Sequence, residues 1–366
     1  MSHPLDLLAL WQTGVDAVRG DSAVKRQIAS GAIHKPDHII AVGKAATAMA
    51  HPATQTWPDV PCLIVTKYGH ADDAPTGAQF IEAAHPVPDA ASLRAGRALI
   101  DAVSGCPGGS HLLMLVSGGA SSLAECPNDG LTLEDLQTAT QGLLASGTAI
   151  GDMNTRRIAN SQIKGGKLLA NFGGARVTTL AISDVEGDSL GTIGSGIGDM
   201  HPKNGIAFDP HIIASNAIAR QAIADASPFP VVTNEETLYE DVSTLAPKLG
   251  ALLRAADAGV HVFGGEPVVH LPANPGLGGR NMALALELAG EIAGRDDLRL
   301  LVAGTDGTDG PTDAAGALVD GQTWTEDAAE ALLRADAYRW LEARGALVKT
   351  GPTGTNVMDV MIAQKM

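Results

Sequence analysis

HLLMLVSGGASS, residues 111–122, joins an unbroken, mostly apolar run to a loop with two glycines and three serines. Such a run, four to eight residues long, is typical of a strand buried on both faces of a parallel sheet. Small residues that follow the strand expose backbone N–H groups where the next helix begins, a usual anion site of α/β proteins. A plain strand–helix turn with a serine cap is the alternative interpretation.

Short aliphatic runs alternate with longer amphipathic runs along most of the chain, which predicts an α/β protein with a helix-covered parallel sheet. The expected strands are His38–Gly43, Cys62–Tyr68, Gln79–Ala84, His111–Ser117, Val177–Asp184, Val260–Phe263 and Leu298–Ala303. The expected helices are Ala45–Thr54, Ala90–Ser104, Leu133–Ser146, Lys164–Asn171, Ile213–Ala226, Ser243–Ala256, Met282–Ala293 and Ala328–Ala343.

Length and composition bound the class of protein. At roughly 150 residues per domain, 366 residues predict about two domains, and the proline-containing break at Ala226–Asn234 places the boundary between 1–228 and 229–366. The net charge of −16 argues against nucleic acid or an anionic membrane as a partner. The sequence has no apolar run of membrane-spanning length, no secretory signal pattern and only three cysteines. We therefore expect a reduced, cytoplasmic protein.

Two further glycine-rich loops carry basic residues. Lys44 follows the strand 38–43 within Val42-Gly43-Lys44-Ala45, where it can reach a phosphate oxygen, although the full phosphate-loop spacing is absent. Arg280 follows GGE (264–266) and GLGG (276–279), at the start of the helix MALALELA. A cation is mildly unfavourable at a helix N-terminus, so Arg280 is expected to hold an anion. For Lys44 a surface position on a helix is the alternative.

Two acidic clusters and one basic cluster are further candidates for a functional site. The acidic clusters are SDVEGD (183–188) and TDGTDGPTD (305–313), and the second lacks the EF-hand spacing. One or two of these carboxylates can still hold Mg²⁺ together with phosphate oxygens, although aspartate also serves as an ordinary turn former. Asn154, Arg156, Arg157 and Lys164 form a basic island that suggests an anionic substrate, with a solvated helix face as the alternative. His85 is interpreted as a residue that fixes its loop.

The loops, taken in order, resemble those of the glycerate 2-kinase family, whose C-terminal half is called the MOFRL domain. The matching stretches are VGKAATAM (42–49), VTKYGH (65–70), EAAHPVPDAASL (82–93), VSGGASSL (116–123), NTRRIANSQIKGGKLLA (154–170), SDVEGDSL (183–190), GGE (264–266), GLGGRN (276–281), AGTDGTDGPTDAAGA (303–317) and GPTGTNVMD (351–359). The resemblance implies a Rossmann-like N-terminal domain, a C-terminal α/β domain of MOFRL type and a cleft between them.

The resemblance also implies an activity: phosphorylation of D-glycerate to 2-phosphoglycerate by ATP with Mg²⁺. On this basis four residues are expected to be catalytic, namely Lys44, Arg280, Asp184 and Asp306. The expected nucleotide contacts are Ser117, Gly118, Gly119, Ser121, Gly264, Gly265 and Glu266, and the expected substrate contacts are Asn154, Arg157, Lys164 and Asn281. The expected metal ligands are Asp184, Asp306 and Asp309.

Two other functions stay open at this point. Some relatives in the family carry the name hydroxypyruvate reductase, but an NAD(P)H enzyme of the dinucleotide-binding type needs a GxGxxG fingerprint that this sequence lacks. A regulator that binds metabolites without catalysis is the second alternative, although one polar pocket would suffice for it. Phosphoryl transfer fits better, because it uses cationic clamps, Mg²⁺ and positioning rather than a covalent nucleophile. We expect a small hydroxy-acid substrate and allow for a homodimer.

Overall fold

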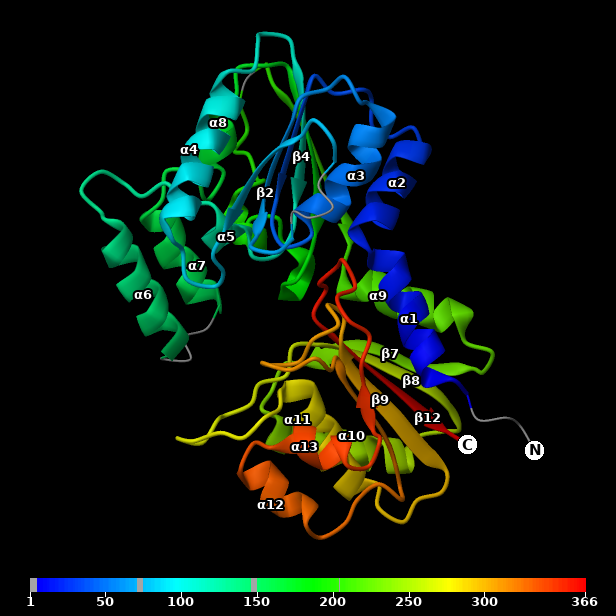
Figure 1. The fold of residues 1–366 in the computed structure, drawn as a ribbon. Helices are drawn as coiled ribbons and strands as arrows, with labels where there is room; N and C mark the ends of the chain where they lie inside the picture. Colours follow the sequence, from blue (N-terminus) through cyan, green and yellow to red (C-terminus); the bar gives the residue numbers. More distant parts are fainter. Residues whose placement is uncertain (1–4, 71–74, 146–149, 204) are drawn as a thin grey trace. The chain divides into compact units, whose positions relative to one another are not determined.

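The computed structural model describes residues 5–70, 75–145, 150–203 and 205–366, and the chain forms two compact units (Figure 1). The N-terminal unit consists of Arg19–Ser215 and Gly354–Asn356. The C-terminal unit consists of Met1–Val18, Asn216–Thr353 and Val357–Met366. The chain thus divides at Ser215–Asn216, ahead of the expected boundary after residue 228. Its first helix, α1 (Leu7–Val18), joins the C-terminal unit.

The N-terminal unit contains a six-stranded sheet in the order β3-β2-β1-β4-β5-β6, in which every pairing is parallel. Its strands are β1 (His38–Val42), β2 (Cys62–Lys67), β3 (Gln79–Ala83), β4 (His111–Val116), β5 (Arg176–Ile182) and β6 (Ala207–Ala214). All six residues of β4 are buried, as expected for a strand covered on both faces. The chain builds outward from β1 to β3 and then returns to the other side at β4, so the order reverses between β1 and β4.

Helices cover both faces of this sheet. Figure 1 shows α2 (Gly20–Ala29) and α3 (Ala46–Thr56) on one face, and α4 (Ala90–Ser104) and α8 (Lys167–Ala170) on the other. The unit also contains α5 (Ala120–Leu123), α6 (Leu133–Ala145), α7 (Ile150–Ala159) and the short 3-10 turns Glu186–Asp188 and Ile193–Gly196. A capping box between Asp89 and Ser92 starts α4 where the sequence predicts it.

The C-terminal unit contains a second six-stranded sheet, in the order β11-β10-β9-β12-β8-β7. Its strands are β7 (Val231–Leu238), β8 (Gly259–Gly265), β9 (Leu298–Gly304), β10 (Gly316–Asp320), β11 (Leu347–Val348) and β12 (Asp359–Lys365). The sheet is mixed, because β7 and β8 are parallel whereas β12 runs antiparallel to both β8 and β9. The last strand of the chain therefore lies in the middle of the sheet.

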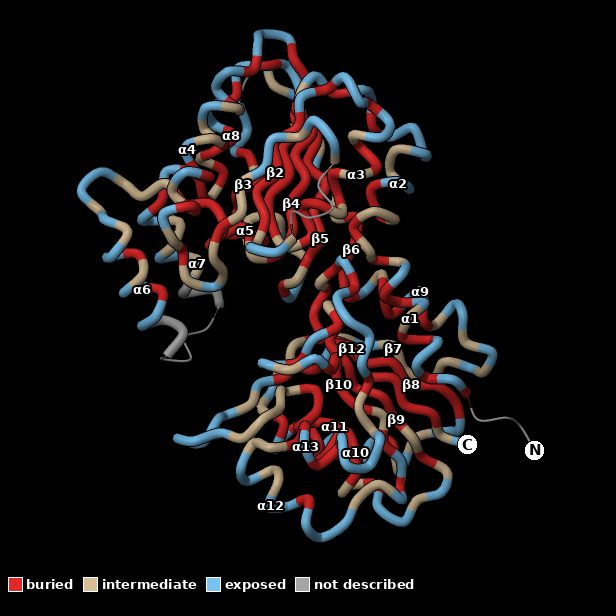
Figure 2. Tube along the Cα trace, viewed as in Figure 1, coloured by how far each residue is buried: buried red, intermediate tan, exposed pale blue. Residues whose placement is uncertain are grey.

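Both faces of the second sheet are covered, and Figure 2 shows its central strands β8, β9 and β12 as largely buried, whereas only Leu238 of the edge strand β7 is buried. Alternate residues of β12 serve the two faces: Met361 packs with α10 (Val242–Ala255) and α11 (Arg280–Glu291), whereas Ile362 packs with α1 and α9 (Asn216–Ala226). The remaining helices, α12 (Ala328–Leu333) and α13 (Ala337–Glu342), lie on the α11 side. None of the described helices is long and apolar enough to cross a membrane.

The expected fold class is confirmed, and seven expected strands and most helices form close to their predicted bounds. Three helix predictions need correction. Ile213 and Ala214 end β6, so that helix begins at Asn216. Gly165 and Gly166 have φ of 61° and 78°, which leaves only Lys167–Ala170 helical. The helix expected at Ala328–Ala343 is interrupted at Ala335, whose φ is 50°. The last residue of the helix expected at Leu133–Ser146 lies outside the described residues.

Candidate active site

The carboxyl ends of the parallel strands gather the predicted residues of the N-terminal unit. Val42 of β1 pairs with Val65 of β2 and with Val116 of β4, so Lys44 and the loop 117–119 follow their strands at the same level. Asp184 follows β5 next to them. In open α/β sheets, ligands bind at this edge where the strand order reverses, which here is between β1 and β4.

The loops after β1 and β4 are joined by hydrogen bonds. The backbone N–H of Lys44 donates to the carbonyl of Gly118 over 2.9 Å, and that of Ala45 donates to Ser117 Oγ over 3.0 Å. Gly43 has a φ of 130°, and a Cβ there would lie 2.2 Å from Ser117 Oγ. A Cβ on Gly118 would lie 1.8 Å from Asp184 Oδ2. The Asp184 carboxylate therefore lies directly against the glycine loop, in space that a larger residue would fill.

The charge of Lys44 has no partner among the described residues. Its ammonium makes no hydrogen bond or ion pair with a described residue, and the same holds for the side chains of Lys67 and Arg157. Burial, together with the charges of Lys44, Lys67 and Arg157, lowers the pKa of His85 to about 3. The loop thus faces a region of positive potential in a protein whose net charge is strongly negative.

Two other predicted residues meet through a serine that the prediction missed. Ser121 Oγ lies 2.8 Å from Ser195 Oγ, and Ser195 donates to Asn154 Oδ1 over 2.8 Å. Ser195 is buried and has a φ of 56°, a left-handed conformation that is uncommon for serine. No pattern in the sequence marks Ser195 as a partner of Ser121, because their loops are distant along the chain.

Lys164 is enclosed in the interior. Its side chain is 1% exposed and forms an ion pair with Glu125, which also accepts a hydrogen bond from Ser161 over 2.6 Å. Burial lowers the pKa of Lys164, and the Glu125 charge opposes this change. Lys164, Glu125, Arg157 and Ser121 line a small cavity of about 30 Å³, which is comparable to the volume of one water molecule. The structure therefore gives Lys164 a protein carboxylate as its partner.

The C-terminal unit assembles a second polar cluster around Arg280. Asp359, the first residue of β12, pairs with Gly265 at the end of β8 and with Gly304 at the end of β9. Arg280 Nε donates to Asp359 Oδ2 over 2.6 Å, and its Nη1 lies 2.9 Å from Glu266 Oε1. Burial alone would disfavour the charged guanidinium, but the Asp359 and Glu266 charges raise the pKa of Arg280. The anions expected beside this arginine thus include two carboxylates of the protein itself.

Asp309 and Asn281 belong to the same cluster. Asp309 accepts the backbone N–H groups of Asn281 (3.2 Å) and Met282 (2.8 Å), so it holds the first turn of α11. Burial and the nearby Asp359 charge raise the pKa of Asp309 to about 7. Asn281 Nδ2 donates to Asp359 Oδ1 over 2.8 Å, while its buried Oδ1 has no partner among the described residues. Asp306, in contrast, is half-buried and accepts from Thr308 in its own turn.

The glycines of the GGE loop lie against buried Asn216, a residue that the prediction missed. A Cβ on Gly264 would lie 1.7 Å from Asn216 Oδ1. Asn216 Nδ2 donates to the carbonyls of Val357 and Asp359, each over 2.9 Å, and its Oδ1 accepts from Arg220 Nε over 2.8 Å. Asn216 thus fixes the start of β12, and with it the carboxylate that holds Arg280.

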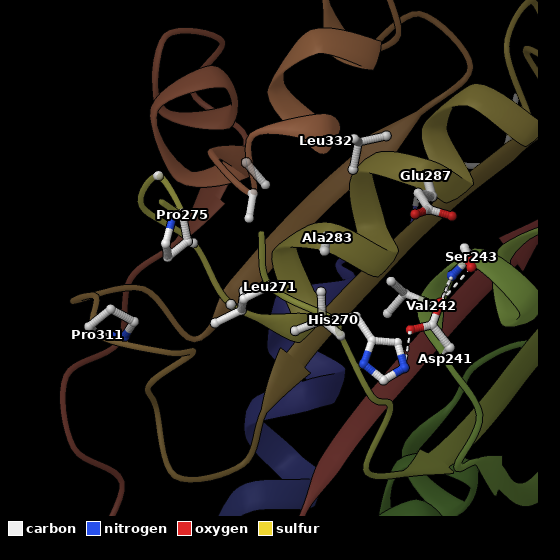
Figure 3. A pocket seen from close by; sticks show the side chains of 16 residues that line it. Asp241, Val242, Ser243, His270, Leu271, Pro275, Ala283, Glu287, Pro311 and Leu332 are labelled. Carbon is white, nitrogen blue, oxygen red and sulfur yellow. Dashed lines mark hydrogen bonds and ion pairs between the residues drawn. The ribbon is translucent and has the colours of Figure 1, made fainter. Parts of the chain in front are cut away.

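A separate cavity of about 330 Å³ lies in the C-terminal unit, and its lining includes none of the predicted site residues (Figure 3). Apolar side chains form most of its wall, with Asp241, His270 and Glu287 at one side. Among the described residues, no group of three or more His, Cys, Asp or Glu side chains is arranged to hold a metal ion. This is compatible with Mg²⁺ binding through one or two carboxylates and the oxygens of a phosphate ligand.

Comparisons with known proteins identify the family of the chain. The model of a domain of unknown function, DUF4147, matches residues 6–206, and the MOFRL family model matches residues 259–359. D-glycerate 2-kinase of Thermotoga maritima is 35% identical over 95% of both chains. An Agrobacterium vitis relative with a hydroxypyruvate reductase name is 36% identical over 88% of this chain and 85% of its own.

The crystal structure of glycerate kinase from Thermotoga maritima matches 98% of both chains with a TM-score of 0.88 at 33% sequence identity. The sequence match, the two family models and the shared fold therefore agree over nearly the whole chain. This chain belongs to the glycerate 2-kinase family of phosphotransferase enzymes.

Proposed function

We propose that this protein transfers the terminal phosphoryl group of ATP to the 2-hydroxyl group of D-glycerate, in the presence of Mg²⁺, to give 2-phosphoglycerate and ADP. The observation that carries the proposal is the placement of Lys44. Lys44 follows β1 where the strand order reverses, its backbone is hydrogen-bonded to the glycine loop 117–119, and its ammonium has no partner among the described residues. The glycerate kinase names of the relatives support the choice of substrate.

Lys44 and the loop 117–119 are proposed to hold the transferring phosphoryl group. A fixed cation is most effective where negative charge redistributes as the bond to the leaving phosphate lengthens. The hydrogen bonds from Lys44 and Ala45 to the loop keep the two segments in register before any ligand arrives. Little of the binding energy is then spent on ordering the site.

Asp184 and Asp306 are proposed as the carboxylates that hold Mg²⁺ or accept the proton of the substrate hydroxyl. Bound there, Mg²⁺ would supply positive charge that neutralises the oxygens of the phosphate. The donor set fits this ion, because Asp184 lies against the phosphate-type loop and carboxylate oxygen is the ligand that Mg²⁺ prefers. Asp309 is not included, since both of its oxygens accept N–H groups of α11.

Arg280 is proposed to bind the carboxylate of the hydroxy acid. Asp359 occupies its Nε edge and Glu266 contacts Nη1, but the five N–H donors of a guanidinium exceed what these two partners use. Because Asp359 and Glu266 already fix the orientation of the arginine, the remaining donors are presented in a defined direction. Asn281, at the start of the same helix, is proposed as a neighbouring contact.

Hydroxypyruvate reduction is the second candidate, because relatives in the family carry that name. One set of assays separates the alternatives. Purified protein is incubated with D-glycerate, ATP and Mg²⁺, ADP release is followed, and phosphorus NMR identifies the phosphorylated carbon. Hydroxypyruvate with NADH or NADPH is tested in parallel.

The expected result is ADP release that needs both glycerate and Mg²⁺, with phosphate on carbon 2. Undiminished turnover in excess EDTA would contradict the role of Mg²⁺, and phosphate on carbon 3 would contradict the proposed product. Oxidation of NADH without ADP release would favour the reductase. Binding of ATP and glycerate without any turnover would favour a regulator.

A further inference from the structure

Three cations of the N-terminal unit have no counterion among the described residues, in a chain with 41 acidic and only 25 basic side chains. Lys44, Lys67 and Arg157 make no hydrogen bond or ion pair through their side chains with any residue that the structure describes. Two surface lysines, by contrast, are paired: Lys35 with Asp59 and Lys248 with Glu240. Three uncompensated cations near one another repel, so their grouping is unfavourable unless an anion binds there.

The sheet register brings these groups together at one edge. Lys67 is the last residue of β2 and pairs with Ala83, the last residue of β3, and His85 follows two residues later. The pairing of Val42 with Val65 places Lys44 at the level of Lys67 on the neighbouring strand. His85 and Lys44 both approach Gly119: a Cβ there would lie 3.1 Å from His85 Cδ2 and 3.0 Å from Lys44 Cγ.

The His85 imidazole is a neutral donor without a protein partner. Burial and the three surrounding cations hold its pKa far below the ordinary histidine value, so the ring is uncharged at neutral pH. Its nitrogens form no hydrogen bond with a described residue. A neutral imidazole has one N–H to donate and one nitrogen to accept. Because cations cannot accept its N–H, the natural partner for this donor is an anion that also contacts the cations.

The charge of the site favours a phosphoryl group over a carboxylate as the anion that binds to these cations and to His85. Of the acidic groups that the structure describes here, Glu125 pairs with buried Lys164, whereas Glu82 accepts the backbone N–H of His70 and keeps its charge. Asp184 lies against Gly118, and His70, whose pKa is also lowered, faces the same lysines. The three cations therefore outnumber Glu82 and Asp184, the carboxylates described beside them. A phosphoryl group has two negative charges and three acceptor oxygens, so it can contact several cations and the His85 N–H at once, whereas a monocarboxylate has one charge and two oxygens.

We propose that Lys67 and His85 complete, together with Lys44 and Arg157, a subsite that binds a phosphoryl group carrying two negative charges. The proposal deepens the proposed kinase activity and rests on it for the identity of the ligand. Two sources share this chemistry, namely the terminal phosphate of the nucleotide and the phosphate of the phosphorylated hydroxy acid.

The test is equilibrium binding to the full chain, measured by calorimetry with inorganic phosphate and pyrophosphate as probes and with acetate as the monocarboxylate control. Lys67→Gln removes the charge at nearly constant length, and His85→Phe removes the donor. Lys67→Arg restores the charge. Lys35→Gln and His34→Gln serve as matched controls, because both residues are exposed in the same unit. Circular dichroism and melting temperatures check that each variant is folded.

Loss of a charge-assisted contact is expected to weaken phosphate binding about tenfold or more in Lys67→Gln and His85→Phe. Lys67→Arg should recover most of the affinity, and the two controls should bind like the wild type. Phosphate affinity of the wild type should also fall with added salt more steeply than that of Lys67→Gln. Competition with 2-phosphoglycerate or with a non-hydrolysable ATP analogue then identifies which source fills the subsite.

Wild-type affinity in both variants, no binding of phosphate or pyrophosphate to the wild type, or equal affinity for acetate would overturn the proposal. These results are independent of turnover. If the variants lose phosphate binding but the wild type phosphorylates no hydroxy acid, the subsite stands and the proposed kinase activity falls. If the wild type is an active kinase whose phosphate binding is unaffected by the substitutions, the kinase activity stands and the subsite falls.

Discussion

The two polar clusters of this protein each centre on one basic residue, but they differ in how that residue is balanced. Lys44 has no ion-pair partner among the described residues, and its neighbours Lys67 and Arg157 are also cations. Arg280 is bound by Asp359 and Glu266 on two edges of its guanidinium. In the first cluster the described positive charges exceed the described carboxylates, whereas in the second one guanidinium faces two carboxylates and no positive charge is in excess.

The difference suggests different tasks. An uncompensated cation raises the local concentration of anions and stabilises added negative charge, which suits a transferring phosphoryl group. An arginine held by two carboxylates loses part of its electrostatic attraction but gains a fixed orientation, which suits recognition of a planar carboxylate. A substitution at Lys44 should therefore lower activity with little change in stability, whereas a substitution at Arg280 should lower both.

Lys44→Ala gives the largest expected effect on activity. Loss of one electrostatic donor at the reacting phosphoryl group lowers kcat by about 10²–10³. Stability should change little, within about 0.5 kcal/mol, because the ammonium has no described partner to lose. Steady-state kinetics and urea unfolding measure the two quantities, with Lys35→Ala as the control. A kcat within a few-fold of the wild-type value would place Lys44 outside the reacting centre.

Arg280→Lys should affect both activity and stability. Lysine cannot reproduce the two-point contact with Asp359, whose side chain is only 2% exposed. The loss of a charge-assisted hydrogen bond corresponds to roughly 10- to 150-fold in kcat/KM for glycerate. The free energy of unfolding should decrease by about 1–3 kcal/mol, because the arginine is partly exposed and solvent screens its ion pairs.

The KM for each substrate separates two roles of Arg280. A rise in the glycerate KM with little change for ATP would support binding of the hydroxy acid. The reverse pattern would mean that Arg280 clamps a phosphate, and full stability together with full activity would remove it from the site. Comparing the loss of stability in Arg280→Lys with that in Lys44→Ala then tests whether ion pairs within the protein stabilise the C-terminal cluster more than the N-terminal one.

Asn216→Ala tests the support behind Arg280 and should have a smaller effect. Asn216 Nδ2 donates to the carbonyls of Val357 and Asp359, and its Oδ1 accepts from Arg220 Nε. The substitution removes these three hydrogen bonds. Unsatisfied buried groups of this kind cost about 1–3 kcal/mol. We expect lower stability and a several-fold drop in activity that follows the displacement of Asp359. Asn274→Ala, at an exposed position of the same unit where the side chain has no hydrogen bond with a described residue, should leave both unchanged.

The sequence predicts five of the six strands of the N-terminal sheet, because most of them are continuous apolar runs that end in glycine or polar residues. Residues 111–116 are one example, and the register then brings Lys44, the serine–glycine loop and Asp184 to one edge. The sequence does not predict β6, which contains Asp209, Pro210 and His211. The second sheet is harder to predict. Its central strand β12 contains only a short apolar run between Asp359 and Lys365, and its neighbours lie far away in the sequence.

The partners of the predicted residues could not be predicted from local patterns. Asp359 contacts Arg280 across 79 positions, and Ser195 contacts Ser121 across 74. The expectation of an anion beside Arg280 followed from its position at a helix start, but that reasoning could not tell a ligand from a carboxylate of the protein. Asn216 lies in a segment predicted as a plain helix, so its contact with the GGE loop carried no sequence signal.

The two clusters should also respond to pH in opposite directions, which is the finest test of the comparison. Burial and Asp359 raise the pKa of Asp309 to about 7 from its ordinary value of 3.8, so the folded protein holds this proton more tightly than the unfolded chain does. The corresponding stability is present below the unfolded pKa and is lost as pH rises toward 7. Asp309→Asn should remove this part of the pH dependence.

For His85 the sign reverses. Burial and the three cations lower its pKa to about 3 from 6.5, so the unfolded chain binds the proton more tightly. The stability contributed by the neutral ring is present above the unfolded pKa and is lost as pH falls through the interval between these values. Urea unfolding from about pH 4 to about pH 8, without phosphate and with EDTA present, gives the difference between wild type and each variant. His85→Gln should flatten the acidic part of the curve and Asp309→Asn the part leading to neutrality. Equal slopes in all three proteins would mean that neither cluster controls these protons, and the contrast between an unbalanced and a balanced site would lose its electrostatic basis.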